Sequence, residues 1–198
     1  MRVDPAEYLR LDLRAHALLA GVPLHDVTIV DLPGGCAGLR LADVRALDAA
    51  APPSRSVNVL FGLRRLLGRA FGWDRTPMRA EESLVSRLSD GDRLASEVAP
   101  GTPAGPFVLV YQFPREALLE TRNATVHGFV CMALAPTAIG YRLYWGVYVR
   151  PVSWITRPYL MAIEPFRRFI VYPAMLQRIR RAWLAAYAPP MGPRSHLT

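Results

Sequence analysis

The spacing of hydrophobic positions changes along the chain and predicts helices and strands in a definite order. Residues 27–32 form a short apolar, β-branched run that a Pro-Gly-Gly turn ends, so we expect a first strand there. Residues 41–47 then carry apolar side chains at helical spacing. A second helix is predicted over residues 57–71, where the leucines form one stripe and the arginines lie mostly off it.

The middle of the chain has apolar runs between turn signals, a pattern typical of β-strands. The predicted strands are residues 83–88, 93–98, 107–113, 117–133 and 141–149, and Asp90-Gly91-Asp92 indicates a hairpin between the first two. The links are short, whereas parallel pairing needs crossovers of about a dozen residues. We therefore expect an antiparallel meander.

Alternation within the last predicted strand assigns its two faces. The face assigned to the interior carries Tyr141, Leu143, Trp145, Val147 and Val149. The same alternation places Tyr144 and Tyr148 on the outer face, together with Arg142 and Arg150.

Helical spacing returns over residues 154–187, and three prolines interrupt it. Each of Pro158, Pro165 and Pro173 must start, kink or break the helix, so we expect a broken or kinked long helix. Residues 189–198 have Pro and Gly without apolar periodicity. They are expected to form a flexible tail after a single α+β domain of residues 1–188.

Composition favours a folded chain without a nucleic-acid function. Hydrophobic residues make up 52% and charged residues 20%, which argues against disorder. The net charge is +8 and every basic residue is arginine, but the arginines are scattered, whereas nucleic-acid domains concentrate their charge. We therefore expect no nucleic-acid partner. Without a secretory signal or a disulfide framework, the expected location is the cytoplasm.

Three stretches carry a resemblance to a known family. They are LFGLRRLLGR at residues 60–69, RNATVH at residues 122–127 and PFRRFIV at residues 165–171. Over residues 25–185 the chain resembles the bacterial DUF2867 family, which is associated with START/Bet v 1-like (SRPBCC) domains. The predicted order of elements is also that of the helix-grip fold. In that fold a curved meander wraps the last helix and leaves an apolar cavity, here with two short helices after the first strand.

The resemblance implies no activity that carries over to this chain. Relatives are fused to nucleotide-binding domains of the short-chain dehydrogenase type, which makes a separate dehydrogenase-type protein a candidate partner. The family's Pro-Phe-His run has Arg167 in place of the His here. No role of that His therefore carries over.

No catalytic or cofactor motif is present in the sequence. The Gly-rich turn at residues 34–38 lacks the spacing of a dinucleotide site, so we interpret it as a plain turn, with Cys36 inert and Cys131 a small core residue. The four His residues are isolated, so we expect no metal and no cofactor.

His127 is the one weak catalytic candidate. It lies mid-strand with Phe129 and Cys131 on its face, where a His can act as a general base or bind a ligand. The interpretation we favour is a structural His bonded to the backbone or to a carboxylate such as Glu120. Glu116 and Glu120, at the start of this strand, are expected to be solvated rather than a catalytic pair.

Aromatic residues in the meander and the last helix favour a small hydrophobic or lipid-like ligand. The candidate ligand-binding residues are Tyr111, His127, Phe129, Trp145, Tyr159 and Phe166. A binding protein is the first hypothesis, and a polyketide-cyclase-like enzyme using His127 is the alternative. A third hypothesis is a peripheral membrane or partner-binding protein acting through the C-terminal helix that carries Arg178, Arg180 and Arg181. A globular helix docked on the sheet gives the same pattern, and we favour it.

Overall fold

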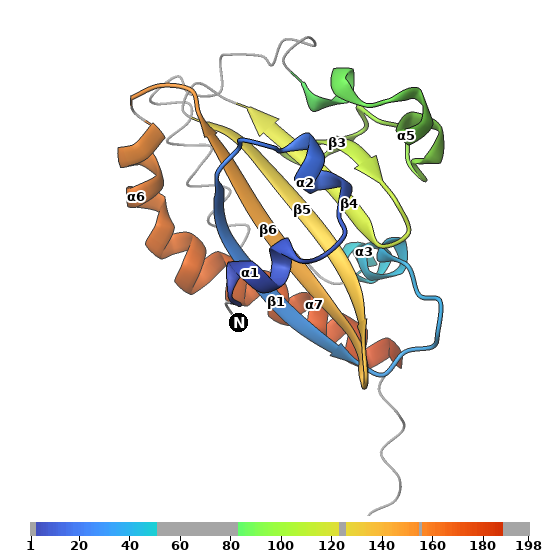
Figure 1. Cartoon of the computed structure of the whole chain (residues 1–198). Helices are drawn as coiled ribbons and strands as arrows, with labels where there is room; N and C mark the ends of the chain where they lie inside the picture. The colour runs from blue at the N-terminus through green and yellow to red at the C-terminus, as the bar shows by residue number, and fades with distance from the viewer. Residues whose placement is uncertain (1–2, 51–82, 123–125, 155, 188–198) are drawn as a thin grey trace, which may run out of the picture.

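The protein is an α+β fold built on one antiparallel sheet with a long C-terminal helix. The computed structural model describes residues 3–50, 83–122, 126–154 and 156–187. The six strands of the described chain have the order β1-β6-β5-β4-β3-β2, so the first strand pairs with the last (Figure 1). Their bounds are β1 Leu24–Pro33, β2 Pro103–Ala104, β3 Phe107–Gln112, β4 Glu116–Arg122, β5 Val126–Thr137 and β6 Gly140–Pro151. This arrangement is compatible with a helix-grip fold.

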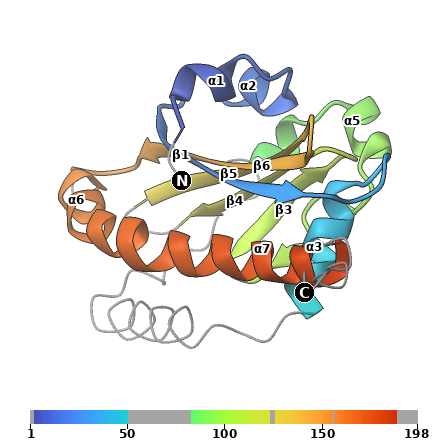
Figure 2. The same ribbon diagram turned by 90° about the horizontal axis from the view of Figure 1, so that it is seen from below.

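Helices cover both faces of the sheet, as the view from below shows (Figure 2). One face carries α3 (Leu41–Ala50) and the C-terminal helical segment, which consists of α6 (Thr156–Phe166), the π-helical turn η4 (Arg167–Val171) and α7 (Tyr172–Tyr187). The other face carries α1 (Pro5–Leu9), α2 (Arg14–Leu18) and the 3₁₀ helix η3 (Leu84–Arg87), with α5 (Asp90–Ala95) beside them. The sheet therefore separates two apolar cores.

The basic helix α7 docks its apolar stripe on the sheet. Leu176, Ile179 and Trp183 are buried in the core on this face, and the Trp183 indole donates a 2.9 Å hydrogen bond to the carbonyl of Pro33. Arg178 binds Asp48 of α3 through two hydrogen bonds of 2.8 and 2.6 Å. The interpretation of this helix as a docked globular helix is therefore confirmed.

Tyr144 and Tyr148 do not face solvent, and this prediction is wrong. They are 5% and 3% exposed, because α1 and α2 fold over their side of the sheet. The Tyr144 hydroxyl donates a 2.6 Å hydrogen bond to Glu7, and Tyr8 packs against both tyrosines with ring centroids 6.1 and 6.3 Å away. Alternation in β6 correctly separated the two faces, but it could not show that the short N-terminal helices cover the second one.

Replacing Gly146 by alanine is expected to destabilise the fold by about 1–3 kcal/mol through overpacking. Gly146 lies in β6 beneath Tyr8, and a Cβ there would come within 2.6 Å of the Tyr8 ring and hydroxyl. Urea unfolding measures the loss. Gly128→Ala in β5 is the matched control, since its Cβ would make only an ordinary 3.6 Å contact with Thr121. Equal losses in the two variants would contradict this packing argument.

Residues 83–98 were predicted as two strands and a hairpin, and both predictions are wrong. Residues 84–87 form η3 and residues 90–95 form α5. Ser83 and Ser89 cap these helices, since their side chains accept hydrogen bonds from the N–H groups of Val85 and Asp92. Asp90-Gly91-Asp92 is therefore the acidic first turn of a helix rather than a hairpin turn.

The remaining strands and the last helix follow the predictions with two adjustments. The strand predicted over residues 117–133 is two strands, β4 and β5, and the short strand β2 was not predicted. The expected break in the last helix is the π-helical turn at Arg167–Val171, which begins directly after Pro165-Phe166. The helix predicted at 57–71 and the tail at 189–198 lie outside the described residues.

Candidate functional site

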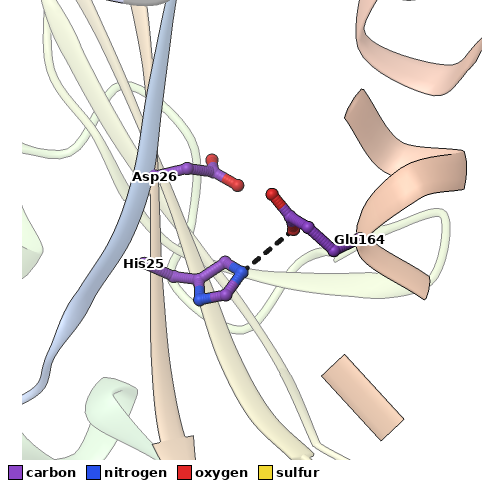
Figure 3. A group of neighbouring side chains, drawn as sticks. All are labelled: His25, Asp26 and Glu164. Atoms are coloured by element: carbon purple, nitrogen blue, oxygen red, sulfur yellow. Dashed lines mark hydrogen bonds and ion pairs between the residues drawn. The ribbon is translucent and has the colours of Figure 1, made fainter. Parts of the chain in front are cut away.

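Polar side chains gather where β1 begins and faces the junction of α6 and α7. His25 and Asp26 come from the strand and Glu164 from α6 (Figure 3). Successive residues of a regular strand point to opposite faces. Here the register of β1 on β6 shifts between Leu24 and Asp26, which is a β-bulge. The bulge re-aims the side chains, so that His25 and Asp26 both point toward Glu164.

The helical side of the site is irregular as well. The turn Arg167–Val171 is π-helical, and such turns occur often at functional sites. Its first residue points inward, since the Arg167 side chain is 16% exposed, whereas Phe169 of the same turn is 70% exposed. Two departures from regular geometry therefore meet at one place, one in the sheet and one in the helix.

A continuous network joins the two elements. Arg167 Nη2 lies 3.0 Å from Asp26 Oδ2, and the Tyr172 hydroxyl lies 3.2 Å from both Asp26 oxygens. Arg167 also contacts the Tyr172 hydroxyl, and its Nη1 lies 3.5 Å from Glu164 Oε2. The same Glu164 oxygen lies 3.1 Å from His25 Nε2. Five side chains from β1, α6, η4 and α7 thus form one cluster.

Burial dominates the electrostatics of the cluster. It raises the pKa of Asp26, whose side chain is 2% exposed, although the Arg167 charge acts in the opposite direction. Burial also raises the pKa of Tyr172, so this hydroxyl keeps its proton. Burial alone lowers the pKa of Arg167, but Tyr172 and Asp26 outweigh it and the net pKa is raised. The site therefore holds the permanent positive charge of Arg167 beside the Asp26 carboxyl group, whose ionised form is disfavoured by burial.

Thr28 adds an unsatisfied group to the same layer. It lies two residues after Asp26 on regular strand, so both side chains face the C-terminal helix. Thr28 is 6% exposed, and within the part of the chain that the structure describes its hydroxyl has no hydrogen-bond partner. An unpaired buried hydroxyl costs about 1–3 kcal/mol. A polar group that is kept buried at this cost requires an explanation.

A zinc ion fits the cluster less well than an organic group does. The ligand atoms of His25, Asp26 and Glu164 lie within 4.8 Å of one another. Atoms bound to one Zn²⁺ at about 2.1 Å lie no more than about 4 Å apart. The guanidinium of Arg167 also already contacts both carboxylates. The arrangement instead offers a donor, an acceptor and a hydroxyl to a polar group of a ligand.

The sheet separates the predicted ligand-binding residues. Tyr111 and Phe129 are fully buried under α1, α2 and η3, and His127 is on the same side of β5 as Phe129. Trp145 packs in the opposite core, against the C-terminal helix. Phe166 is 49% exposed at the end of α6, in which Tyr159 also lies. Phe129 pairs with Tyr148 of β6, which faces the layer opposite to that of Trp145, so these residues do not line one common space. A role of each in ligand binding stays a prediction.

Glu120 is buried, and the prediction that it is solvated is wrong. It is 0% exposed and accepts hydrogen bonds from the N–H of Leu84, at 2.9 Å, and from the Ser83 hydroxyl. His127 Nε2 lies 3.6 Å from Glu120 Oε2, longer than a normal hydrogen bond. Glu120 thus fastens η3 to β4, and the buried Nε2 of His127 has no hydrogen-bond partner among the described residues. A catalytic role for His127 stays a prediction.

Glu116 is buried in the same way, so the solvated interpretation is wrong for it too. Its carboxylate accepts hydrogen bonds from the N–H groups of Arg14 and Ala15 at 2.9 and 2.8 Å, and from the Tyr111 hydroxyl. Glu116 therefore caps the first turn of α2 across the sheet surface. The two glutamates of β4 therefore hold α2 and η3 on the sheet through hydrogen bonds.

A hollow of about 470 Å³ opens beside Glu116. Leu11, Leu13 and Phe113 contribute apolar lining, and Glu116 lies at its edge. This hollow is on the face of α1 and α2, not between the sheet and the C-terminal helix, where the cavity was expected. The carboxylate of Glu116 already accepts hydrogen bonds from four donors, the N–H groups of Arg14 and Ala15, the Tyr111 hydroxyl and, at 3.9 Å, the Cys131 thiol. The polar cluster at β1 is therefore the stronger candidate site.

Two other features match their plain interpretations. Gly34 and Gly35 have φ values of 78° and 86° and form a turn after β1, where the side chains of Leu39 and Trp183 leave no room for a Cβ on Gly35. Cys131 is completely buried in the core, and Cys36 is exposed.

Sequence reasoning missed most of the cluster. The first strand was expected to begin at Val27, which left out His25 and Asp26. Two signals were nevertheless present. Glu164 is the only acidic residue between positions 152 and 187, and Arg167 stood out where the resembling family has a His. Each marked a position where a charge was unusual, but neither indicated its partner.

The comparisons with known proteins give a family and no described activity. A search of curated proteins finds no match to the chain. No helix among the described residues is both long and apolar enough to cross a membrane. The model of a family described as "Protein of unknown function (DUF2867)" matches residues 18–174, a span that contains every residue of the polar cluster. Because this match covers well over half of its length, the chain belongs to the DUF2867 family.

Proposed function

We propose that this protein binds a small, largely apolar molecule between the sheet and its C-terminal helix, as a START/Bet v 1-like carrier of the helix-grip type. The polar cluster would hold the one polar group of that molecule. The observation that carries the proposal is the buried, unpaired Thr28 hydroxyl beside the Asp26–Arg167 pair. Binding sites of this kind combine apolar walls with a few fixed polar groups.

The surroundings of the cluster define the class of ligand. Trp145 lies opposite Thr28 in the register of β1 on β6, and Leu160 of α6 packs against the same core. These side chains suit an aliphatic or aromatic body. Arg167 can donate, Asp26 can accept, and Thr28 can do both. A ligand with a hydroxyl or carbonyl at one end satisfies this set without adding a charge to a buried site.

Thr28→Val separates a binding hydroxyl from a structural one. Valine has the same shape but no hydroxyl, so the free protein is expected to become more stable by about 1 kcal/mol, because an unpaired polar group is removed. The affinity for the ligand is expected to fall about tenfold, the equivalent of one lost hydrogen bond. Thr121→Val is the control, since the Thr121 hydroxyl has a partner in the carbonyl of Pro106 at 2.9 Å.

Native mass spectrometry of the purified protein, followed by denaturing extraction, tests the proposal directly. We expect a small hydrophobic molecule that co-purifies with the wild type and is depleted in Thr28→Val. A panel of fatty acids, sterols and polyketides should also raise the melting temperature of the wild type more than that of the variant. If the wild type is empty and no member of the panel stabilises it, the binding function is rejected.

A further inference from the structure

Large apolar side chains are exposed on the C-terminal segment between Trp154 and Ile170. Exposed large hydrophobic side chains of the described residues concentrate here, with Trp154 84%, Met161 77%, Phe169 70%, Phe166 49% and Ile170 41% exposed. Elsewhere in the described chain only Leu9, Leu94 and Ile139 are comparable, and they are far apart in sequence. We call these five residues the outer patch. A surface of this kind on a folded protein indicates an interaction.

The outer patch is not an unfinished part of the core. The inward side of the same segment is already occupied, with Glu164 and Arg167 bound to β1 and Leu160 packed on the core. Figure 1 shows α6 beside the sheet, next to the edge strand β1. The segment therefore turns Glu164 and Arg167 toward the protein and exposes large apolar side chains, which an ordinary surface helix would bury.

Charge identifies the partner. The exposed arginines of this segment are Arg157 and Arg168, and Arg180 and Arg181 follow on α7. The only carboxylate between positions 152 and 187 is Glu164, which is turned toward His25. Apolar side chains flanked by cations, without an exposed carboxylate, suit the interface of a bilayer that contains anionic lipids. Trp154 and the phenylalanines are residues that favour this interface.

We infer that the outer patch docks this protein onto the surface of anionic membranes. The attachment is peripheral, and it uses α6 and η4, whereas the apolar stripe of α7 is buried against the sheet. The π-helical turn links this surface to the polar cluster, since η4 directs Arg167 inward and Phe169 outward. The inference stands independently of the proposed ligand binding, because the exposed patch and its charges are present whether or not the interior binds a molecule.

Sedimentation of the full chain with vesicles tests this inference. We expect binding to vesicles of phosphatidylcholine and phosphatidylserine, weaker binding to phosphatidylcholine alone, and a loss of binding at high salt. Met161→Ser/Phe169→Ser should weaken binding at least tenfold. Both side chains are mostly exposed, so circular dichroism and the melting temperature should stay unchanged. Arg157→Glu/Arg168→Glu should reduce binding to the anionic vesicles in particular.

Leu94→Ser/Ile139→Ser is the matched control, because these side chains are 88% and 73% exposed outside the outer patch. It should bind vesicles like the wild type. Equal binding by the Met161/Phe169 variant and the wild type would overturn the inference. It would also be overturned if vesicles fail to bind and the same variant instead abolishes self-association or capture by an acidic protein, since the patch would then be a protein interface.

Discussion

Glu116→Ala is expected to destabilise the protein by about 3–5 kcal/mol, close to the upper end of single-residue effects. The substitution removes the acceptor for the N–H groups of Arg14 and Ala15 and for the Tyr111 hydroxyl. Ala15 and Tyr111 are both 0% exposed, so these two released donors cannot turn to water. The variant also loses the cap of α2, which covers one apolar core. Urea denaturation followed by circular dichroism measures the loss.

Two variants make this result interpretable. Glu97→Ala removes a surface pair with Arg40, at 3.0 Å, and a long 3.4 Å hydrogen bond from Gln112, and should cost no more than about 1 kcal/mol. Glu116→Gln keeps the side-chain shape and one acceptor oxygen, so its loss should lie between those of Glu116→Ala and Glu97→Ala. If Glu116→Ala is no worse than Glu97→Ala, Glu116 does not hold α2 on the sheet.

Local pattern was sufficient for the strands that pair with their neighbours along the chain. Alternation between positions 140 and 151 predicted β6 and its two faces, because that periodicity is a property of the strand itself. It failed for residues 83–98, where Ser83 and Ser89 act as helix caps. Those caps are visible in the sequence, but the Asp-Gly pair is also a hairpin signal, and local residues alone do not decide between the two.

The polar cluster was beyond the reach of such patterns because irregular geometry creates it. Without the bulge in β1, His25 and Asp26 would point to opposite faces. In a regular helix Arg167 and Tyr172, five residues apart, would lie about 140° apart around the axis, whereas the π-helical turn brings them into contact. The sequence patterns did not predict the burial of Glu116 and Glu120 for a related reason. Each carboxylate finds its donors on a helix distant in sequence, so residue type alone favoured a solvated position.

The largest effect at the candidate site is expected for Arg167→Met, which leaves the buried Asp26 carboxyl without its cation. Breaking a buried pair in this way costs about 3–5 kcal/mol at neutral pH. Met fills a similar volume, so lost packing contributes little to this cost. Asp26→Asn/Arg167→Met removes both charges and should be more stable than Arg167→Met alone. Chemical denaturation of the two variants and the wild type gives the coupling between the residues.

The loss in Arg167→Met is also expected to shrink as the pH falls. The pKa of Asp26 is raised in the folded protein, so the folded state binds more protons than the unfolded state between the two pKa values. The free energy of unfolding contributed by this group therefore increases on acidification through that window. Arg167 lowers the pKa of Asp26, and its removal widens the window upward.

His25, Glu164 and Tyr172 also face this cluster, and Arg167 contacts the last two. Both variants lack Arg167, so the difference between Arg167→Met and Asp26→Asn/Arg167→Met isolates Asp26. Unfolding measured from neutral pH down to the acid side of the Asp26 pKa should show Arg167→Met approaching the wild type. The Asp26→Asn/Arg167→Met protein should not show this gain in stability on acidification, since it has no carboxyl group at position 26 to titrate. A pH-independent loss in Arg167→Met would mean that Arg167 stabilises the junction by packing, and that the buried carboxyl does not depend on its charge.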